Sequence, residues 1–90
     1  MSSTDATSLR PRIRALLVDD LQWQGDPEEL TDDLPLIADH VIDSLGLLRV
    51  VGRLESEFGI RVADEDVVAS NFGSISQIAD FVARAQAPAA

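Results

Sequence analysis

The residues with the clearest chemical potential in this 90-residue chain are His40, Asp43 and Ser44, which lie within five positions of one another. A histidine, an aspartate and a serine are the side-chain types of a hydrolytic triad. Triads are usually assembled from distant segments, however, and they need an oxyanion hole and a substrate cleft. A short acidic chain offers little of either. We therefore expect no catalytic residue and no enzyme activity, and we assign His40 to a surface loop near Ser44.

Ser44 opens the strongest helical pattern in the sequence, which Gly59 closes. A serine is a favoured helix cap and an aspartate near a helix start is ordinary, so a purely structural role for Ser44 and Asp43 stays open. A helix start also has unpaired amides and a positive dipole end, which suit a phosphodiester on the Ser44 hydroxyl. The core-facing stripe of this helix, about 100° wide, consists of Leu47, Val50, Val51, Leu54 and Phe58.

The opposite face of this helix has an unusual composition. Its residues are Leu45, Leu48, Arg49, Gly52 and Ser56. Two leucines and a glycine on the outer side of a short helix, beside an exposed serine, are typical of a docking surface. Single exposed leucines are common in proteins, so an incidental composition is the alternative. We interpret these five residues as the partner-binding face.

Two segments precede this helix. A first helix is predicted to begin near Thr7 or Ser8 and to end between residues 20 and 23. Residues 24–43 then form a long connection that contains six large aliphatic side chains among its acids. A loop of this length is usually functional or packed down by its own side chains. We expect the second case, with the loop lying across the core.

Two further helical segments follow Gly59. The segment from Asp64 to Ala69 predicts one short helical turn, with Val67 or Val68 pointing inward. Ser74 is placed to cap a last helix of about 12 residues. These elements predict an all-α fold, a small four-helix bundle with three longer helices and a short third one. The domain is expected to span 8–86, between disordered tails at 1–7 and 87–90.

The charge of the chain excludes nucleic acid as a partner. The net charge is −9, from 16 acidic residues and seven arginines without any lysine. So acidic a domain repels a phosphate backbone and favours encounters with basic protein surfaces. Nine of the acids lie in residues 19–43, but their order does not fit a calcium-binding loop, and we expect no metal site.

Other classes are excluded by what the sequence lacks. Without cysteine there is no disulfide framework, thiolate metal site or cysteine nucleophile. No apolar run approaches the ~18 residues that span a bilayer. The first ten residues have no apolar signal core, so we expect a cytoplasmic protein without membrane contact.

Several segments together resemble the carrier proteins that bear phosphopantetheine. In that family D-S-L opens the second helix and an L-E-x-E-F-like segment closes it, as Asp43-Ser44-Leu45 and Leu54–Phe58 do here. D-S-L alone is common by chance, but its place at a helix start, with matching flanks, makes the combined pattern specific. The flanking segments that also resemble the family are 36–42, 59–62, 64–67 and 71–75, and the resemblance covers residues 8–84.

The resemblance implies a modification and a function. A phosphopantetheinyl transferase would attach 4′-phosphopantetheine from coenzyme A to Ser44, beside Asp43, and the thiol of the arm would hold an acyl or aminoacyl group as a thioester. Adenylating or acyltransferring enzymes would load this cargo, and biosynthetic enzymes would process it. The chain begins with methionine and holds one domain, so we expect a discrete, monomeric carrier.

Departures from the family pattern point to specialised metabolism, such as polyketide or nonribosomal peptide synthesis. Arg49 and Arg53 interrupt the acidity of the second helix, and the glycine-rich approach of many peptidyl carriers is absent. We therefore expect a dedicated partner with an acidic or apolar site facing Arg49. The alternative is an unmodified helical interaction domain that uses Leu45, Leu48 and Arg49.

Overall fold

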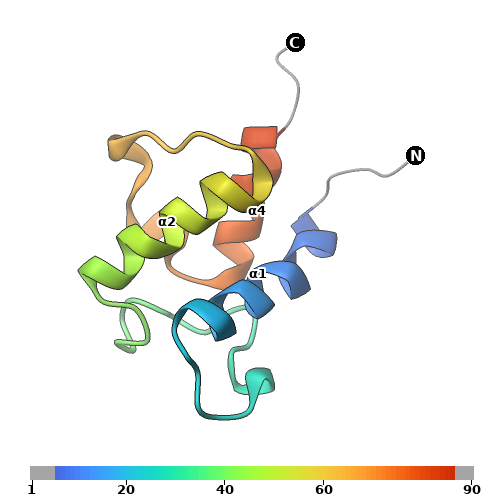
Figure 1. Ribbon diagram of the computed structural model, residues 1–90, viewed down its shortest axis with the longest axis vertical. Coiled ribbons are helices and arrows are strands. Elements are labelled where there is room, and N and C mark those ends of the chain that lie inside the picture. The colour runs from blue at the N-terminus through green and yellow to red at the C-terminus, as the bar shows by residue number, and fades with distance from the viewer. Residues whose placement is uncertain (1–5, 87–90) are drawn as a thin grey trace.

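The computed structural model describes residues 6–86, and in this range it is a bundle of helices without a strand (Figure 1). This confirms the predicted all-α fold with a short third helix. Of the predicted tails at 1–7 and 87–90, residues 1–5 and 87–90 lie outside the described residues, whereas residues 6 and 7 belong to the first helix and not to a tail. The elements are α1 (Ala6–Asp20), η1 (Pro27–Glu29), α2 (Ser44–Phe58), η2 (Asp64–Asp66), α3 (Ala69–Phe72) and α4 (Ile75–Gln86), of which η1 and η2 are single 3₁₀ turns.

The first and last helices form the main packing interface of the bundle. α1 packs mainly against α4, and in the view of Figure 1 α4 runs across the direction that α1 and α2 share. The predicted core stripe of α2 is buried except for Leu47, which is half-buried. Phe81 of α4 is also buried and lies 5.2 Å from Phe72 between ring centroids. The amphipathic periods therefore identified the core-facing sides of both helices.

The ends of α2 and α4 follow the local signals in the sequence. Gly59 ends α2 with φ 65°, a left-handed conformation that glycine adopts without steric cost. The Ser74 hydroxyl accepts a hydrogen bond from the Gln77 amide at 3.2 Å and so caps α4. α1 begins at Ala6, so Thr7 belongs to the helix, and Pro11 lies in its second turn.

The short third helix differs from the prediction. Instead of one turn over residues 64–69, the chain forms η2 and then α3, separated by extended backbone at Val68 (φ −134°, ψ 160°). Val68 is 43% exposed and Val67 is partly buried, so Val67 is the inward-facing valine. The helical turn moves toward Phe72 because this side chain is fully buried in the core.

The long connection lies across the core, as its apolar side chains predicted. Leu30, Leu36 and Ile42 are buried in it. Arg14 binds the loop twice, with Nε donating to the Leu30 carbonyl at 2.8 Å and the guanidinium paired with Asp32. Arg10 lies 3.4 Å from the same carboxylate. The loop that leads to Ser44 is therefore held in place by α1.

None of the helices within residues 6–86 has the length and hydropathy that crossing a bilayer requires.

Candidate functional site

Ser44 is the first residue of α2, and Asp43 caps the helix. The Asp43 backbone is extended (φ −94°, ψ −177°), and its Oδ1 accepts the Gly46 amide at 2.7 Å. The possibility that Ser44 itself is the cap is therefore wrong, because Asp43 occupies that position. The Ser44 side chain is exposed, and its hydroxyl forms no hydrogen bond with any described residue. It is thus free to react.

Gly46 is a third residue of this site that the sequence reasoning overlooked. It is buried, and a Cβ there would lie 3.0 Å from Asp43 Oδ1 and 3.6 Å from Ile42 Cγ2. A larger residue would push the capping carboxylate aside. A glycine inside a helix lowers the stability of the protein relative to alanine. Gly46 in the predicted helix was therefore the sequence signal that could have identified this close contact.

The start of α2 fits an anionic group on the Ser44 oxygen. The amides of Ser44 and Leu45 form no hydrogen bond with any described residue, because the first helical bond joins the Leu47 amide to the Asp43 carbonyl at 2.8 Å. Free amides and the positive end of the helix dipole favour negative charge at this position. A phosphodiester on Ser44 therefore meets suitable donors in this chain.

His40 lies beside Ser44, as expected for a loop residue near the site. It is exposed and has a left-handed backbone, with φ 60°, and its amide donates to the Ile37 carbonyl at 3.1 Å. Within residues 6–86 its side chain makes no hydrogen bond to Asp43 or Ser44, so the three residues do not form a triad. One pocket of about 300 Å³ is lined by Ile37, His40, Ile42, Asp43, Ser44 and Leu47.

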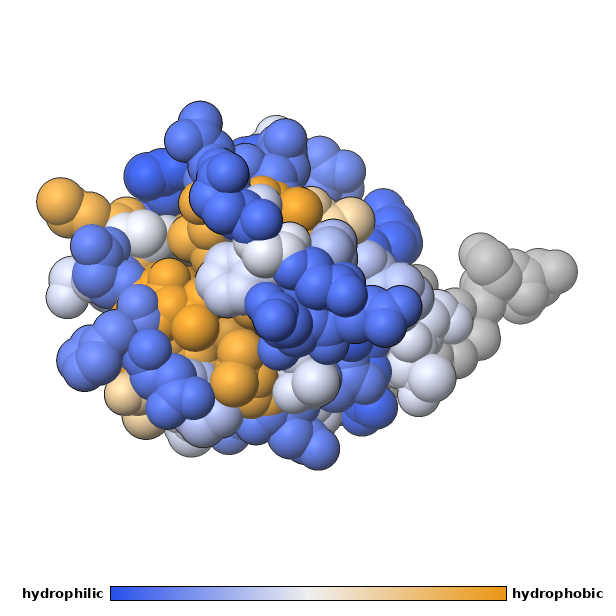
Figure 2. Space-filling view, turned by 90° about the horizontal axis from the view of Figure 1, so that it is seen from below, coloured by the Kyte–Doolittle hydropathy of each residue, from blue (hydrophilic) through white to orange (hydrophobic). Residues whose placement is uncertain are grey.

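The outer face of α2 is open to solvent. Leu45 is 74% and Leu48 60% exposed, and Ser56 is exposed one helical turn beyond Gly52. A Cβ built on Gly52 meets nothing within 4 Å. The predicted partner-binding residues therefore lie on one accessible surface, although their role in docking stays a prediction. Figure 2 shows apolar surface among hydrophilic side chains on the side of the molecule where α2 begins.

Arg49 and Arg53 are bound to the end of α1. Arg49 donates to the Asp20 carbonyl at 2.7 Å and lies 3.7 Å from Asp20 Oδ2, while Arg53 lies 3.2 Å from the Asp19 carboxylate. The Asp20 side chain is only 9% exposed, and these cations compensate its charge and the negative end of the α1 dipole. The Arg49 side chain nevertheless stays 63% exposed.

The described residues contain no cluster of three histidine, cysteine, aspartate or glutamate side chains that could hold a metal ion.

Comparisons with known proteins point to one family. Residues 11–82 match the family model described as a phosphopantetheine attachment site. A polyketide-8 synthase acyl carrier protein 2 from Streptomyces avermitilis is 37% identical over 68 residues, which cover 74% of this chain and 76% of the relative. An acyl carrier protein from Thermosynechococcus vestitus is 28% identical over 71 residues, covering 79% and 83% of the two chains.

Proposed function

Because the chain belongs to the family of carrier proteins with covalently attached 4′-phosphopantetheine, we propose that Ser44 is the residue that bears this arm. The observation that carries the proposal is the Ser44 hydroxyl, which is exposed and free of hydrogen bonds to the described residues. Asp43 leaves it free by taking the capping position itself. The arm supplies a terminal thiol, which holds an acyl group as a thioester.

The attachment reaction needs an accessible hydroxyl and a place for the new negative charge. A bond forms between Ser44 Oγ and the phosphorus of coenzyme A that bears the pantetheine. The pyrophosphate bond breaks, the Ser44 proton is lost, and adenosine 3′,5′-bisphosphate leaves. The amides of Ser44 and Leu45, which form no hydrogen bond with a described residue, would hold the phosphodiester that remains. The role of Asp43 is to hold the start of α2 in this geometry.

The outer face of α2 is the surface at which we place the partner enzymes. Exposed apolar side chains next to the attachment point are suited to a contact that forms and breaks at each transfer. Leu45 and Leu48 supply that contact, and Gly52 lets a partner approach the helix backbone closely. Arg49 and Ser56 flank them. The transferase and the cargo-loading and cargo-processing enzymes would meet the chain here.

The cargo we propose is an acyl group of a polyketide type. The relative from Streptomyces avermitilis is named as a polyketide synthase carrier, and this similarity supports the assignment. The chain would serve as a monomeric carrier that performs no catalysis. It would present the thioester to a dedicated set of enzymes in specialised metabolism.

An intact-mass measurement tests the attachment site. The protein is incubated with coenzyme A and a broad-specificity phosphopantetheinyl transferase and then weighed. We expect the mass to rise by one phosphopantetheine, and Ser44→Ala to abolish the rise. Ser56→Ala is the matched control, since it removes another exposed hydroxyl from the same helix and leaves the gain intact. A folded protein without any mass gain would favour the unmodified interaction domain.

A further inference from the structure

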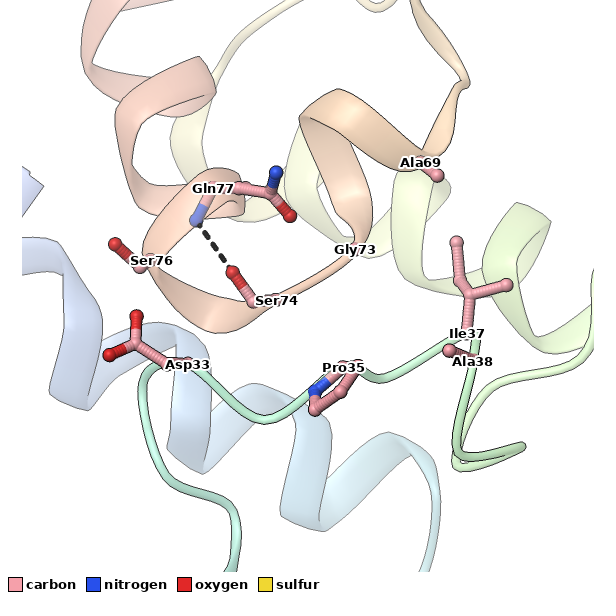
Figure 3. Close-up of a pocket in the computed structure, with 9 residues that line it drawn as sticks. All are labelled: Asp33, Pro35, Ile37, Ala38, Ala69, Gly73, Ser74, Ser76 and Gln77. Atoms are coloured by element: carbon pink, nitrogen blue, oxygen red, sulfur yellow. Dashed lines mark hydrogen bonds between the residues drawn. The ribbon is translucent and has the colours of Figure 1, made fainter.

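A second pocket lies on the side of the molecule where the long loop passes the start of α4. Its volume is about 510 Å³. One wall is the loop segment 33–38 and the other is the α3–α4 junction, and Figure 3 shows the side chains that border it. The lining residues are Asp33, Pro35, Ile37, Ala38, Ala69, Gly73, Ser74, Ser76 and Gln77.

Backbone hydrogen bonds hold the two walls of this pocket together. The Leu36 amide donates to the Gly73 carbonyl at 2.7 Å, and the Ser76 amide donates to the Asp32 carbonyl at 2.9 Å. Gly73 has no room for a side chain, because a Cβ would lie 2.5 Å from the Ala69 carbonyl oxygen. The pocket is therefore a preformed part of the fold.

Ile37 connects this pocket with the one at Ser44. It lines both pockets, and it is partly exposed although it does not belong to the apolar cluster that forms the core. In Figure 3 it stands at one end of the pocket with Ala38, while Asp33 and Ser76 stand at the other. An apolar side chain with no part in the core, placed between two pockets, is available to contact a ligand.

The chemistry of the two pockets matches an uncharged, amphipathic chain. Both are lined mostly by apolar atoms. The Gln77 carboxamide borders the larger one, with its Oε1 over Gly73, and its side chain forms no hydrogen bond with any described residue. It can pair with an amide of a ligand, as donor or acceptor.

A different route from Ser44 is less suitable. On the other side of His40 lies a pocket of about 440 Å³ with a mostly polar lining. Asp20 and Arg49 border this pocket and neither of the two pockets on the route over Ile37, and their charges would have to be desolvated under a neutral apolar chain. The observations therefore favour the route over Ile37.

We propose that the phosphopantetheine arm on Ser44 lies over Ile37 and docks its amide-bearing part in the pocket between the loop and α4, against Gln77. The inference rests on the proposed attachment at Ser44. The arm reaches roughly 20 Å, about the extended length of six residues. Ile37 lines both pockets, so a chain that leaves Ser44 passes from the smaller pocket to the larger one over a single side chain. The docked arm lies at the surface and leaves the packed core undisturbed.

Amide chemical shifts of the unmodified and the arm-bearing protein test this path. Intact mass first establishes that the arm is present. We expect shift changes at Ile37, Ala38, Gly73 and Gln77, in addition to those next to Ser44. Ile37→Ala removes three carbons from a partly buried contact and should lower the ratio of docked to free arm about fivefold. The distant shift changes should shrink accordingly.

Val68→Ala is the control, because it shortens another exposed aliphatic side chain that borders neither pocket and lies outside the partner-binding face. It should leave the distant shift changes intact. With the arm present, changes confined to residues 43–47, or centred on Gln22, His40 and Arg49, would overturn the proposed path while leaving the attachment site standing. Without any mass gain, the attachment at Ser44 and this path both fail.

Discussion

Gly52 offers a quantitative test of the view that the outer face of α2 is built for docking. Glycine in a helix interior lowers stability by about 0.5–1 kcal/mol relative to alanine. A Cβ at Gly52 meets nothing within 4 Å, so Gly52→Ala should recover this amount without steric cost. For a domain of this size, the midpoint of thermal unfolding should then rise by about 2–8 °C.

Gly46 within α2 and Gly59 directly after it serve as internal controls for that measurement. At Gly59 the backbone has φ 65°, so an alanine there should lower the free energy of unfolding by about 1 kcal/mol. At Gly46 the new Cβ would lie 3.0 Å from the capping carboxylate. Gly46→Ala should therefore fall short of Gly52→Ala by about 1 kcal/mol, the typical value of a cap. Thermal and urea unfolding, followed by circular dichroism, measure all three variants.

Function and stability should move in opposite directions at Gly52. If the glycine is retained so that a partner can approach the helix closely, Gly52→Ala should slow cargo loading although the protein is more stable. If Gly52→Ala is no more stable than the natural chain, the conclusion that a Cβ at Gly52 meets no steric obstacle is wrong. A variant that is more stable and loads at an unchanged rate would refute the role of Gly52 in docking.

Four other substitutions test residues of α2 and its cap. Asp43→Ala should lower the free energy of unfolding by about 1 kcal/mol, whereas Asp43→Ser should retain most of it, because serine is also a good cap; equal losses in urea unfolding would argue against the capping role. Arg49→Glu and Arg53→Glu should both lower the free energy of unfolding, because each places a like charge beside the nearly buried Asp20 carboxylate, but only Arg49→Glu, one turn nearer Ser44, should lower kcat/KM of the cognate loading enzyme. Equal kinetics for both variants would show that Arg49 serves only to anchor α1.

The helices of this chain could be predicted where the signal is local. α2 and α4 have apolar stripes at the helical period. Gly59 directly after α2 and Ser74 directly before α4 are residue types that favour a helix cap. The serine at the start of α2 was found for the same reason. Its neighbour Asp43 was found too, but which of the two is the cap depends on backbone angles that both residue types tolerate.

Features that depend on distant parts of the chain were beyond sequence reasoning. Arg49 was read as a partner-facing cation, and its contact with Asp20 joins residues 29 positions apart. The break at Val68 follows from the burial of Phe72 against α4, which no local pattern reveals. The pocket between the loop and α4 forms where a backbone hydrogen bond joins Leu36 to Gly73. These two residues are 37 positions apart in the sequence, so no local pattern predicts their contact.

The pairing of α1 with α4 has a consequence for how the chain reaches its fold. The main packing interface joins the first helix to the last, so the contact closes nearly the whole length of the domain. Forming this interface costs more loop-closure entropy than packing helices that are neighbours in the sequence. The larger cost slows folding. During synthesis the buried side chains of α1 lack their main packing partner until α4 has left the ribosome. These side chains are Leu9, Ile13, Leu16 and Leu17. We expect the nascent chain to acquire its protection against proteases only at that late stage.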